Sequence, residues 1–175
     1  MTDRWLSIIG LGEDGLSGLS GAARTLLDTA EVLIGGKRHL AMIPDDGRER
    51  HAWPTPMHKL IDDIGRFRGR PVAVLASGDP LCFGVGKHLA KRVPANELTI
   101  VPAPSAFSLA AARLGWSLPD TTCFTLHGRT NRKYIVGIII NQLKRSNAFF
   151  NYGEEESVNQ SLKFTELRNV VNAHF

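Results

Sequence analysis

A buried β-strand is predicted by the apolar run Pro71-Val72-Ala73-Val74-Leu75-Ala76, which is ended at once by Ser77-Gly78-Asp79-Pro80. An almost uninterrupted apolar strand is typical of a parallel sheet, because helices cover both of its faces. Ligands of open parallel sheets bind beyond the carboxyl ends of the strands. The acidic residue at this end, Asp79, is therefore the first candidate for a functional side chain.

Short strands and helices alternate on both sides of this run. The other predicted strands are residues 5–10, 31–36 and 97–101, and the predicted helices are residues 19–29, 58–67, 84–93 and 105–114. Ser20 and Ser105 are placed to cap the first and last of these helices. The alternation predicts an α/β domain with an open, mainly parallel sheet flanked by helices.

Composition favours an ordinary globular protein. The 175 residues are 43% hydrophobic and 22% charged, with a modest net charge of +4. Basic residues are scattered, which favours a solvated surface over nucleic-acid binding. No apolar run approaches the ~20 residues that cross a bilayer, and the N-terminus lacks the features of a signal peptide. We therefore expect a cytoplasmic location, in which Cys82 and Cys123 are free thiols rather than a disulfide or metal ligands.

The composition changes after about residue 128. Asparagine becomes frequent, alanine becomes rare and proline is absent, while residues 134–140 fit a strand and residues 162–171 a short amphipathic helix. The segment from Thr130 is shorter than the roughly 50 residues of the smallest independent domains. We expect a domain at residues 1–118, followed at residues 119–175 by a linker and a truncated or atypical second-domain segment.

A glycine-rich loop, Gly10-Leu11-Gly12-Glu13-Asp14-Gly15, follows the first predicted strand. Glycines there allow a tight turn and bring backbone N–H groups close to a ligand. The spacing also satisfies the G-x-G-x-x-G fingerprint of dinucleotide sites. That fingerprint requires a helix that opens at the motif, whereas this helix is predicted several residues later, and Glu13 and Asp14 would repel a pyrophosphate. A nicotinamide or flavin site is therefore the disfavoured alternative.

Two further loops follow predicted strands. In the first, Asp79 is either a rigid ligand-facing carboxylate or the cap of the next helix in a plain turn. The second, residues 101–107, has a path fixed by prolines and opens a helix whose first N–H groups can bind a ligand. Small side chains at Ser105 and Ala106 leave room for an adenosine-sized group. An ordinary helix start explains the same residues.

The order and spacing of these three loops resemble the tetrapyrrole (corrin/porphyrin) methyltransferases. The resemblance rests on the glycine loop, on Ser77-Gly78-Asp79-Pro80, and on the Pro102-Ala103-Pro104-Ser105-Ala106 segment that opens the alanine-rich helix. Finer similarity to the family's precorrin and cobalt-precorrin C5-methyltransferases lies in VLIGGKRHL at residues 32–40, AAARLG at 110–115 and LHGR at 126–129. Together these motifs cover about residues 1–129.

The resemblance implies a site for S-adenosylmethionine, released as S-adenosylhomocysteine, in a cleft between two α/β domains. By resemblance, the cofactor-binding residues are Gly78, Asp79, Cys82, Ser105, Ala106, His127 and Gly128. Asp79 is also the implied catalytic residue, which either orients the cofactor or helps to remove a ring proton. The residues implied to face the substrate are Gly10, Gly12 and Glu13, together with Lys37, Arg38 and His39 as partners for its carboxylates. A solvated loop explains the last three equally well.

The implied activity is S-adenosylmethionine-dependent C-methylation of a precorrin or cobalt-precorrin at C5 in cobalamin (vitamin B12) biosynthesis. The expected partners are the corrinoid substrate, a second copy of the chain in a homodimer, and a separate decarboxylating C15-methyltransferase, with no nucleic acid, membrane or metal. The tail from Thr130 does not resemble the family's second domain. The alternative is therefore an inactive, truncated or chimeric fragment that acts at most as a binding module.

Overall fold

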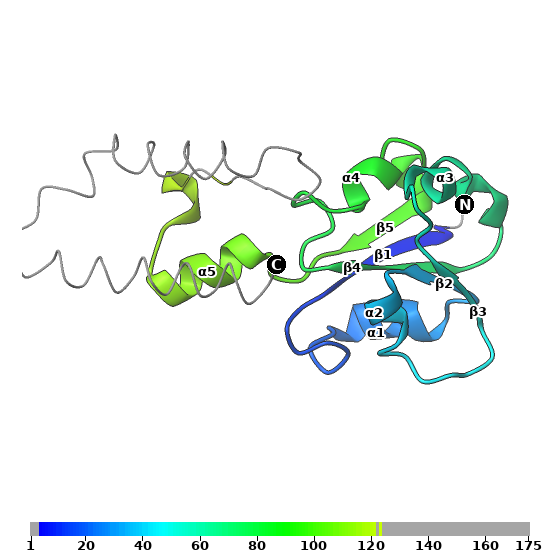
Figure 1. Ribbon diagram of the computed structural model, residues 1–175, viewed down its shortest axis with the longest axis horizontal. Coiled ribbons are helices and arrows are strands. Elements are labelled where there is room, and N and C mark those ends of the chain that lie inside the picture. Colours follow the sequence, from blue (N-terminus) through cyan, green and yellow to red (C-terminus); the bar gives the residue numbers. More distant parts are fainter. Residues whose placement is uncertain (1–3, 122, 124–175) are drawn as a thin grey trace, which may run out of the picture. The chain divides into compact units, whose positions relative to one another are not determined.

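The computed structural model describes residues 4–121 and 123, and the chain divides into two compact units with a boundary after Ala106. In the first unit, five strands form one parallel sheet in the order β3-β2-β4-β1-β5 (Figure 1). The strands are β1 (Leu6–Leu11), β2 (Val32–Gly35), β3 (Glu49–Ala52), β4 (Val72–Ser77) and β5 (Leu98–Val101). The predicted α/β fold with a parallel sheet is confirmed.

Strand β4 forms the centre of the sheet, as its apolar sequence predicts. It pairs with β1 and β2, so that Val72 lies between Leu6 and Val32. Successive side chains of a strand point to opposite faces. Val72 therefore packs into one apolar cluster and Ala73 into another on the opposite face. Burial on both faces explains why the strand reads as a continuous apolar run.

Helices cover both faces of this sheet (Figure 1). One face is covered by α1 (Gly21–Asp28) and α2 (Lys37–Leu40), and the other by α3 (His58–Asp62), the 3-10 helix η1 (Ile64–Phe67) and α4 (Gly86–Leu89), while a 3-10 turn η2 (Ala95–Glu97) leads into β5. Ser20 caps α1 as predicted, because its Oγ accepts a hydrogen bond from the N–H of Ala23 at 3.2 Å.

Two predicted helices are shorter in the structure. The helix predicted over residues 58–67 is divided into α3 and η1 at Asp63, whose backbone (φ −99°, ψ 10°) leaves the helical region. The helix predicted over residues 84–93 is reduced to α4. Its start is delayed because Gly84 and Gly86 pack against the Pro80 carbonyl oxygen, which would lie 2.6 and 2.7 Å from a Cβ at these glycines.

Strand β3 and helix α2 were not predicted, nor were the 3-10 helices η2 and η3 (Leu118–Asp120). Strand β3 reads Glu49-Arg50-His51-Ala52 and lacks apolar alternation. It lies at the edge of the sheet and is held by backbone pairing with β2. Pairing of this kind depends on the neighbouring strand and leaves little signal in the strand's own sequence.

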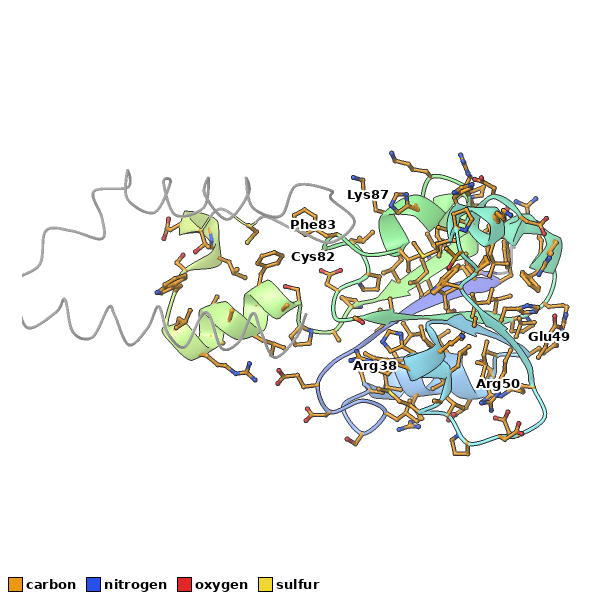
Figure 2. The ribbon with its side chains drawn as sticks, viewed as in Figure 1. Arg38, Glu49, Arg50, Cys82, Phe83 and Lys87 are labelled. Atoms are coloured by element: carbon orange, nitrogen blue, oxygen red, sulfur yellow. The ribbon has the colours of Figure 1, made fainter. Side chains whose placement is uncertain are left out.

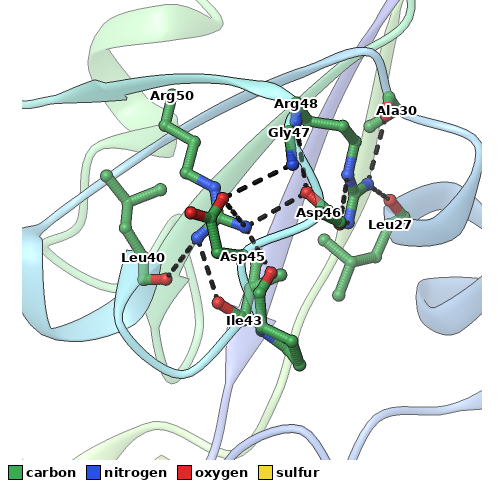
Figure 3. A network of polar contacts seen from close by, with 10 residues as sticks. Leu27, Ala30, Leu40, Ile43, Asp45, Asp46, Gly47, Arg48 and Arg50 are labelled. Carbon is green, nitrogen blue, oxygen red and sulfur yellow. Dashed lines mark hydrogen bonds and ion pairs between the residues drawn. The ribbon is translucent and has the colours of Figure 1, made fainter.

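Arg48, just before β3, and Arg50, within β3, bind carbonyl groups at the ends of α1 and α2 (Figure 3). Arg48 Nη1 donates to the carbonyls of Leu27 and Ala30 at 2.6 and 3.1 Å. Arg50 Nη1 donates to the carbonyls of Leu40 and Ile43 at 3.3 and 3.0 Å. The last carbonyls of a helix lack intrahelical partners and carry partial negative charge, so cationic donors stabilise them. The pair therefore fastens both helices of one face to the edge of the sheet.

An aspartate completes this network. Arg48 Nε donates to Asp46 Oδ2 at 2.7 Å, and Arg50 Nη2 donates to Asp46 Oδ1 at 3.1 Å. These hydrogen bonds hold the pKa of Asp46 well below its ordinary value, and the bond from Arg48 has the largest effect. The carboxylate therefore stays ionised and orients both guanidinium groups.

Replacing Arg50 by alanine is expected to lower the free energy of unfolding by about 2 kcal/mol, because the carbonyls of Leu40 and Ile43 lose a charged donor. Urea denaturation measures the change. The matched control is Arg66→Ala, which removes an exposed pair with Asp63 and a contact over the Phe67 ring and should alter stability by about 1 kcal/mol or less. An equal loss in the two variants would contradict the capping role of Arg50.

In the second unit the structure describes residues 107–121 and 123. Helix α5 (Ala106–Leu114) starts at the boundary and is followed by a 3-10 helix, η3 (Leu118–Asp120). Gly115 ends α5 with a φ of 66°, and the Trp116 N–H donates to the Ala111 carbonyl at 2.9 Å, as in a Schellman motif. In the described ranges, every helix is too short or too polar to cross a membrane.

Several predictions of the sequence analysis lie outside the described residues. These are the strand over residues 134–140, the helix over residues 162–171, and the cofactor-binding residues His127 and Gly128. The domain boundary at residue 118 stays a prediction.

Candidate functional site

Three loops meet at the carboxyl edge of the sheet, after β1, β4 and β5. The Gly78 N–H donates to the Leu11 carbonyl at 2.7 Å, and the Ala103 N–H donates to the Gly78 carbonyl at 3.3 Å. A Cβ placed on Gly10 would lie 2.0 Å from the Gly78 carbonyl oxygen and 2.6 Å from the Ala103 nitrogen. The loops therefore pack backbone against backbone. We call this contact of Gly10, Gly78 and Ala103 the three-loop junction.

Gly78 is required for two reasons. Its φ of 56° is left-handed, and a Cβ there would lie 3.0 Å from the Pro104 carbonyl oxygen and 3.3 Å from the Ser105 Cα. Ser105 itself is buried, whereas Ala106 is exposed at the start of α5. The structure thus brings together Gly78 and Ser105, which the resemblance implies in cofactor binding.

Asp79 lies directly beyond the junction in a tight turn. Its Oδ1 accepts a hydrogen bond from the Leu81 N–H at 2.8 Å, and its carbonyl accepts one from the Cys82 N–H at 3.0 Å. The cap position of α4 is Val85, so the alternative in which Asp79 caps the next helix is wrong. Within residues 4–121 and 123, Asp79 Oδ2 accepts no hydrogen bond. One carboxylate oxygen is therefore fixed by the backbone, and the other is available to a ligand.

An apolar loop follows this aspartate (Figure 2). Leu81 and Phe83 are each 52% exposed, and Cys82 between them is a half-buried free thiol. Phe83 has a left-handed φ of 59°, which is rare for a bulky side chain. Backbone outliers of this kind gather at ligand-binding sites. The conformation of the loop is compatible with the predicted role of Cys82, which stays a prediction.

The glycine loop after β1 does not open a helix. Gly15 and Ser17 close two turns by donating to the carbonyls of Gly12 and Asp14 at 3.2 Å each, and α1 begins only at Gly21. The structural requirement of the dinucleotide fingerprint is therefore not met. Gly12 is half-buried and Glu13 is exposed.

The three basic residues after β2 lie in helix α2, so the loop of the alternative interpretation is wrong, while the solvent exposure that it predicts holds for Lys37 and Arg38. Lys37 and Arg38 are exposed, whereas His39 is buried, with its Nε2 3.1 Å from Ser77 Oγ. Burial lowers the pKa of His39, and the positive charge of Arg38 lowers it further. Substrate binding by Lys37 and Arg38 stays a prediction, while His39 faces the inside of the fold.

Sequence reasoning missed two residues of the site. Ser77 bonds to His39, and Ala103 supplies a backbone N–H to the junction. Both stand inside the motifs quoted from the sequence. Neither has a residue type that indicates such a role, because each contact joins segments far apart along the chain.

Comparison with known proteins identifies relatives of the chain. Residues 6–150 match the family model described as Tetrapyrrole (Corrin/Porphyrin) Methylases, which extends past residue 129, where the motifs end. The chain is 48% identical over 126 residues to the precorrin-6Y C(5,15)-methyltransferase (decarboxylating) of Sinorhizobium sp., covering 71% of this chain and 30% of that protein. It is 36% identical over 124 residues to the cobalt-precorrin-7 C(5)-methyltransferase of Salmonella typhimurium, covering 71% of this chain and 62% of that protein.

Solved structures agree with the fold. The methyltransferase CobJ matches with a TM-score of 0.56 at 24% identity, over 81% of this chain and 63% of that chain. The cobalamin biosynthesis precorrin-6Y methylase (cbiE) of Archaeoglobus fulgidus matches with a TM-score of 0.54 at 29% identity, over 73% of this chain and 67% of that chain. Because the family model spans most of the sequence and the described fold agrees with it, this chain belongs to the tetrapyrrole (corrin/porphyrin) methylase family.

Proposed function

We propose that this chain methylates a precorrin or cobalt-precorrin at C5 with S-adenosylmethionine, as a step of cobalamin biosynthesis. The observation that carries the proposal is the three-loop junction at the carboxyl edge of the sheet, with Asp79 directly beyond it and Oδ2 of Asp79 unbonded among the described residues. Ligands of open parallel sheets bind at this edge. The substrate class follows from the relatives named for precorrin-6Y and cobalt-precorrin-7.

The residues near the junction suit S-adenosylmethionine. Ribose hydroxyls and the methionine ammonium group are donors, and the free Oδ2 of Asp79 is an acceptor held in place by the turn. Small side chains at Ser105 and Ala106 leave space for a nucleoside. Gly78 would shape this site through the junction, because its backbone groups bond those of Leu11 and Ala103. When bound, the cofactor supplies an electrophilic methyl group on a sulfonium.

The chain's contribution to such a reaction is alignment of the reacting groups. Asp79, fixed through Oδ1, either orients the cofactor or accepts the proton that leaves the ring carbon. Gly10, Gly12 and Glu13 would face the tetrapyrrole. The exposed cations Lys37 and Arg38 attract its carboxylates.

The proposal also includes partners and a location. The relative from Sinorhizobium sp. is named for methylation at C5 and C15 with decarboxylation, and this chain covers 30% of it. By analogy with that relative's printed name, the proposed partner is a decarboxylating C15-methyltransferase. We further propose that the chain works as a homodimer in the cytoplasm.

Isothermal titration calorimetry with S-adenosylhomocysteine tests the proposal, with NADH as the control ligand. We expect micromolar binding of S-adenosylhomocysteine and none of NADH. Methyl transfer to a corrin precursor unmethylated at C5, followed by mass spectrometry, then distinguishes an enzyme from a binding module. A folded protein that binds neither ligand would overturn the proposal and favour the inactive fragment, whereas binding of NADH alone would favour the dinucleotide alternative.

A further inference from the structure

A hydrogen bond connects helix α2 to the carboxyl end of β4. Nε2 of His39 lies 3.1 Å from Oγ of Ser77, and only 9% of His39 is exposed. Its other ring nitrogen, Nδ1, is enclosed and has no hydrogen-bond partner among the described residues. Buried polar groups are nearly always hydrogen-bonded. An enclosed imidazole with one unpaired nitrogen therefore requires a functional or structural reason.

The unpaired nitrogen indicates which tautomer the ring adopts. With its proton on Nε2, His39 donates to Ser77 Oγ, and Nδ1 is left with only a bare lone pair. With the proton on Nδ1, an N–H group would be buried without an acceptor, which is rare in folded proteins. The Nε2–H tautomer is therefore favoured. In this arrangement the Ser77 hydroxyl keeps its own proton to donate elsewhere.

The surroundings keep the ring neutral. Gly35 and Gly36 face it from the end of β2, and Ser77 faces it from β4; none of them carries a charge. Arg38, the next residue on α2, is the charged group that acts on the ring within the described part of the chain. Burial and Arg38 both lower the pKa of His39. A second proton would create a buried, unpaired N–H in a charged ring.

We propose that neutral His39 is a positioning residue that holds the Ser77 hydroxyl, so that the hydroxyl proton is donated to a carboxylate of the ligand bound at the three-loop junction. Ser77 is exposed at the carboxyl end of β4 and immediately precedes Gly78 and Asp79, so it stands at the edge of the sheet where the ligand is proposed to bind. The inference rests on the proposed function for the ligand, since both S-adenosylmethionine and the corrin precursor carry carboxylates. His39 then acts through Ser77 and does not touch the substrate itself.

The pair is tested first without any ligand. Nitrogen-15 NMR of the full chain should show His39 as the Nε2–H tautomer with a pKa below about 6.5. Ser77→Ala should shift this pKa, while the ring nitrogen signals of the exposed His88 stay at their wild-type positions as the control. An Nδ1–H tautomer, or a His39 pKa that Ser77→Ala does not alter, would overturn the inference whether or not the chain binds the proposed cofactor.

Three probes then identify the carboxylate. S-adenosylhomocysteine carries the cofactor carboxylate, 5′-methylthioadenosine lacks it, and uroporphyrin III carries the carboxylates of a tetrapyrrole. Ser77→Ala should lower the affinity for either S-adenosylhomocysteine or uroporphyrin III by about tenfold, as expected for loss of a hydrogen bond to a charged group. The affinity for methylthioadenosine should not change. The affected probe shows which ligand Ser77 contacts.

The contribution of His39 is separated from simple loss of packing. His39→Ala should lower the affinity for the same probe. The double variant with Ser77→Ala should bind no more weakly than Ser77→Ala alone, because both substitutions remove the same interaction. His39→Gln retains an N–H donor near Nε2 and should restore affinity. The inference would be overturned if the losses of affinity in His39→Ala and Ser77→Ala were additive in the double variant, or if Ser77→Ala bound every probe as the wild type does. A wild-type chain that passes the NMR test but binds no probe would instead refute the proposed function.

Discussion

Replacing Gly10 by alanine is expected to weaken S-adenosylhomocysteine binding by at least about a hundredfold, because a shift of 1 Å at a site can have that effect. The added Cβ would lie 2.0 Å from the Gly78 carbonyl oxygen and 2.6 Å from the Ala103 nitrogen. Both atoms belong to backbone, so the loops themselves must move apart. We also expect the free energy of unfolding to fall by about 3 kcal/mol, as it does in overpacked cores. Calorimetric titration and urea denaturation measure the two effects.

Gly21→Ala is the matched control for this substitution. A Cβ at Gly21 meets nothing within 4 Å, and the residue begins α1. Alanine is the better helix former by up to about 1 kcal/mol, so stability should be equal or higher and binding unchanged. Wild-type affinity and stability in Gly10→Ala would mean that the loops are not closed against each other.

Replacing Asp79 by asparagine is expected to weaken S-adenosylhomocysteine binding by about fiftyfold, as for loss of a hydrogen bond to a charged group. The amide oxygen of asparagine can still accept the hydrogen bond from the Leu81 N–H, which the wild-type Oδ1 accepts at 2.8 Å. The turn is therefore kept, while the negative charge at Oδ2 is lost. Binding by calorimetry and methyl transfer by mass spectrometry are measured on the same preparation.

The two assays separate the roles proposed for Asp79. Loss of affinity indicates that the carboxylate orients the cofactor, whereas normal affinity with slow methyl transfer indicates that it accepts the ring proton. Asp28→Asn, an exposed change at the end of α1, serves as the control and should affect neither assay. Normal binding and normal transfer in Asp79→Asn would remove this residue from the site.

The sheet could be predicted because its central strand carries the signal within its own sequence. Val72 to Ala76 are buried on both faces, so apolar residues stand at consecutive positions. Strand β3 could not be predicted in the same way, since Glu49 and Ala52 are exposed and its backbone pairing with β2 comes from the neighbouring strand. Local patterns identify elements that are stabilised by burial and miss those stabilised by their neighbours.

The candidate site likewise has features that could be predicted from local sequence and features that could not. Glycine and proline in the three loops indicate special backbone geometry, and the left-handed φ of Gly78 agrees with that reading. The sequence does not show that Gly10 touches Ala103, because their contact depends on the order of strands in the sheet. The burial of His39 was also missed, since its basic neighbours Lys37 and Arg38 are exposed.

The order of the strands also determines when the sheet can be completed during synthesis. Strand β1 leaves the ribosome first, yet both of its neighbours come much later, at Val72 for β4 and Leu98 for β5. All six residues of β1 are buried in the finished sheet. Long-range pairing in parallel sheets forms slowly and leaves apolar segments exposed to aggregation. Until Val101 has emerged, β1 therefore lacks at least one of its two neighbouring strands, and its apolar edge is exposed to aggregation.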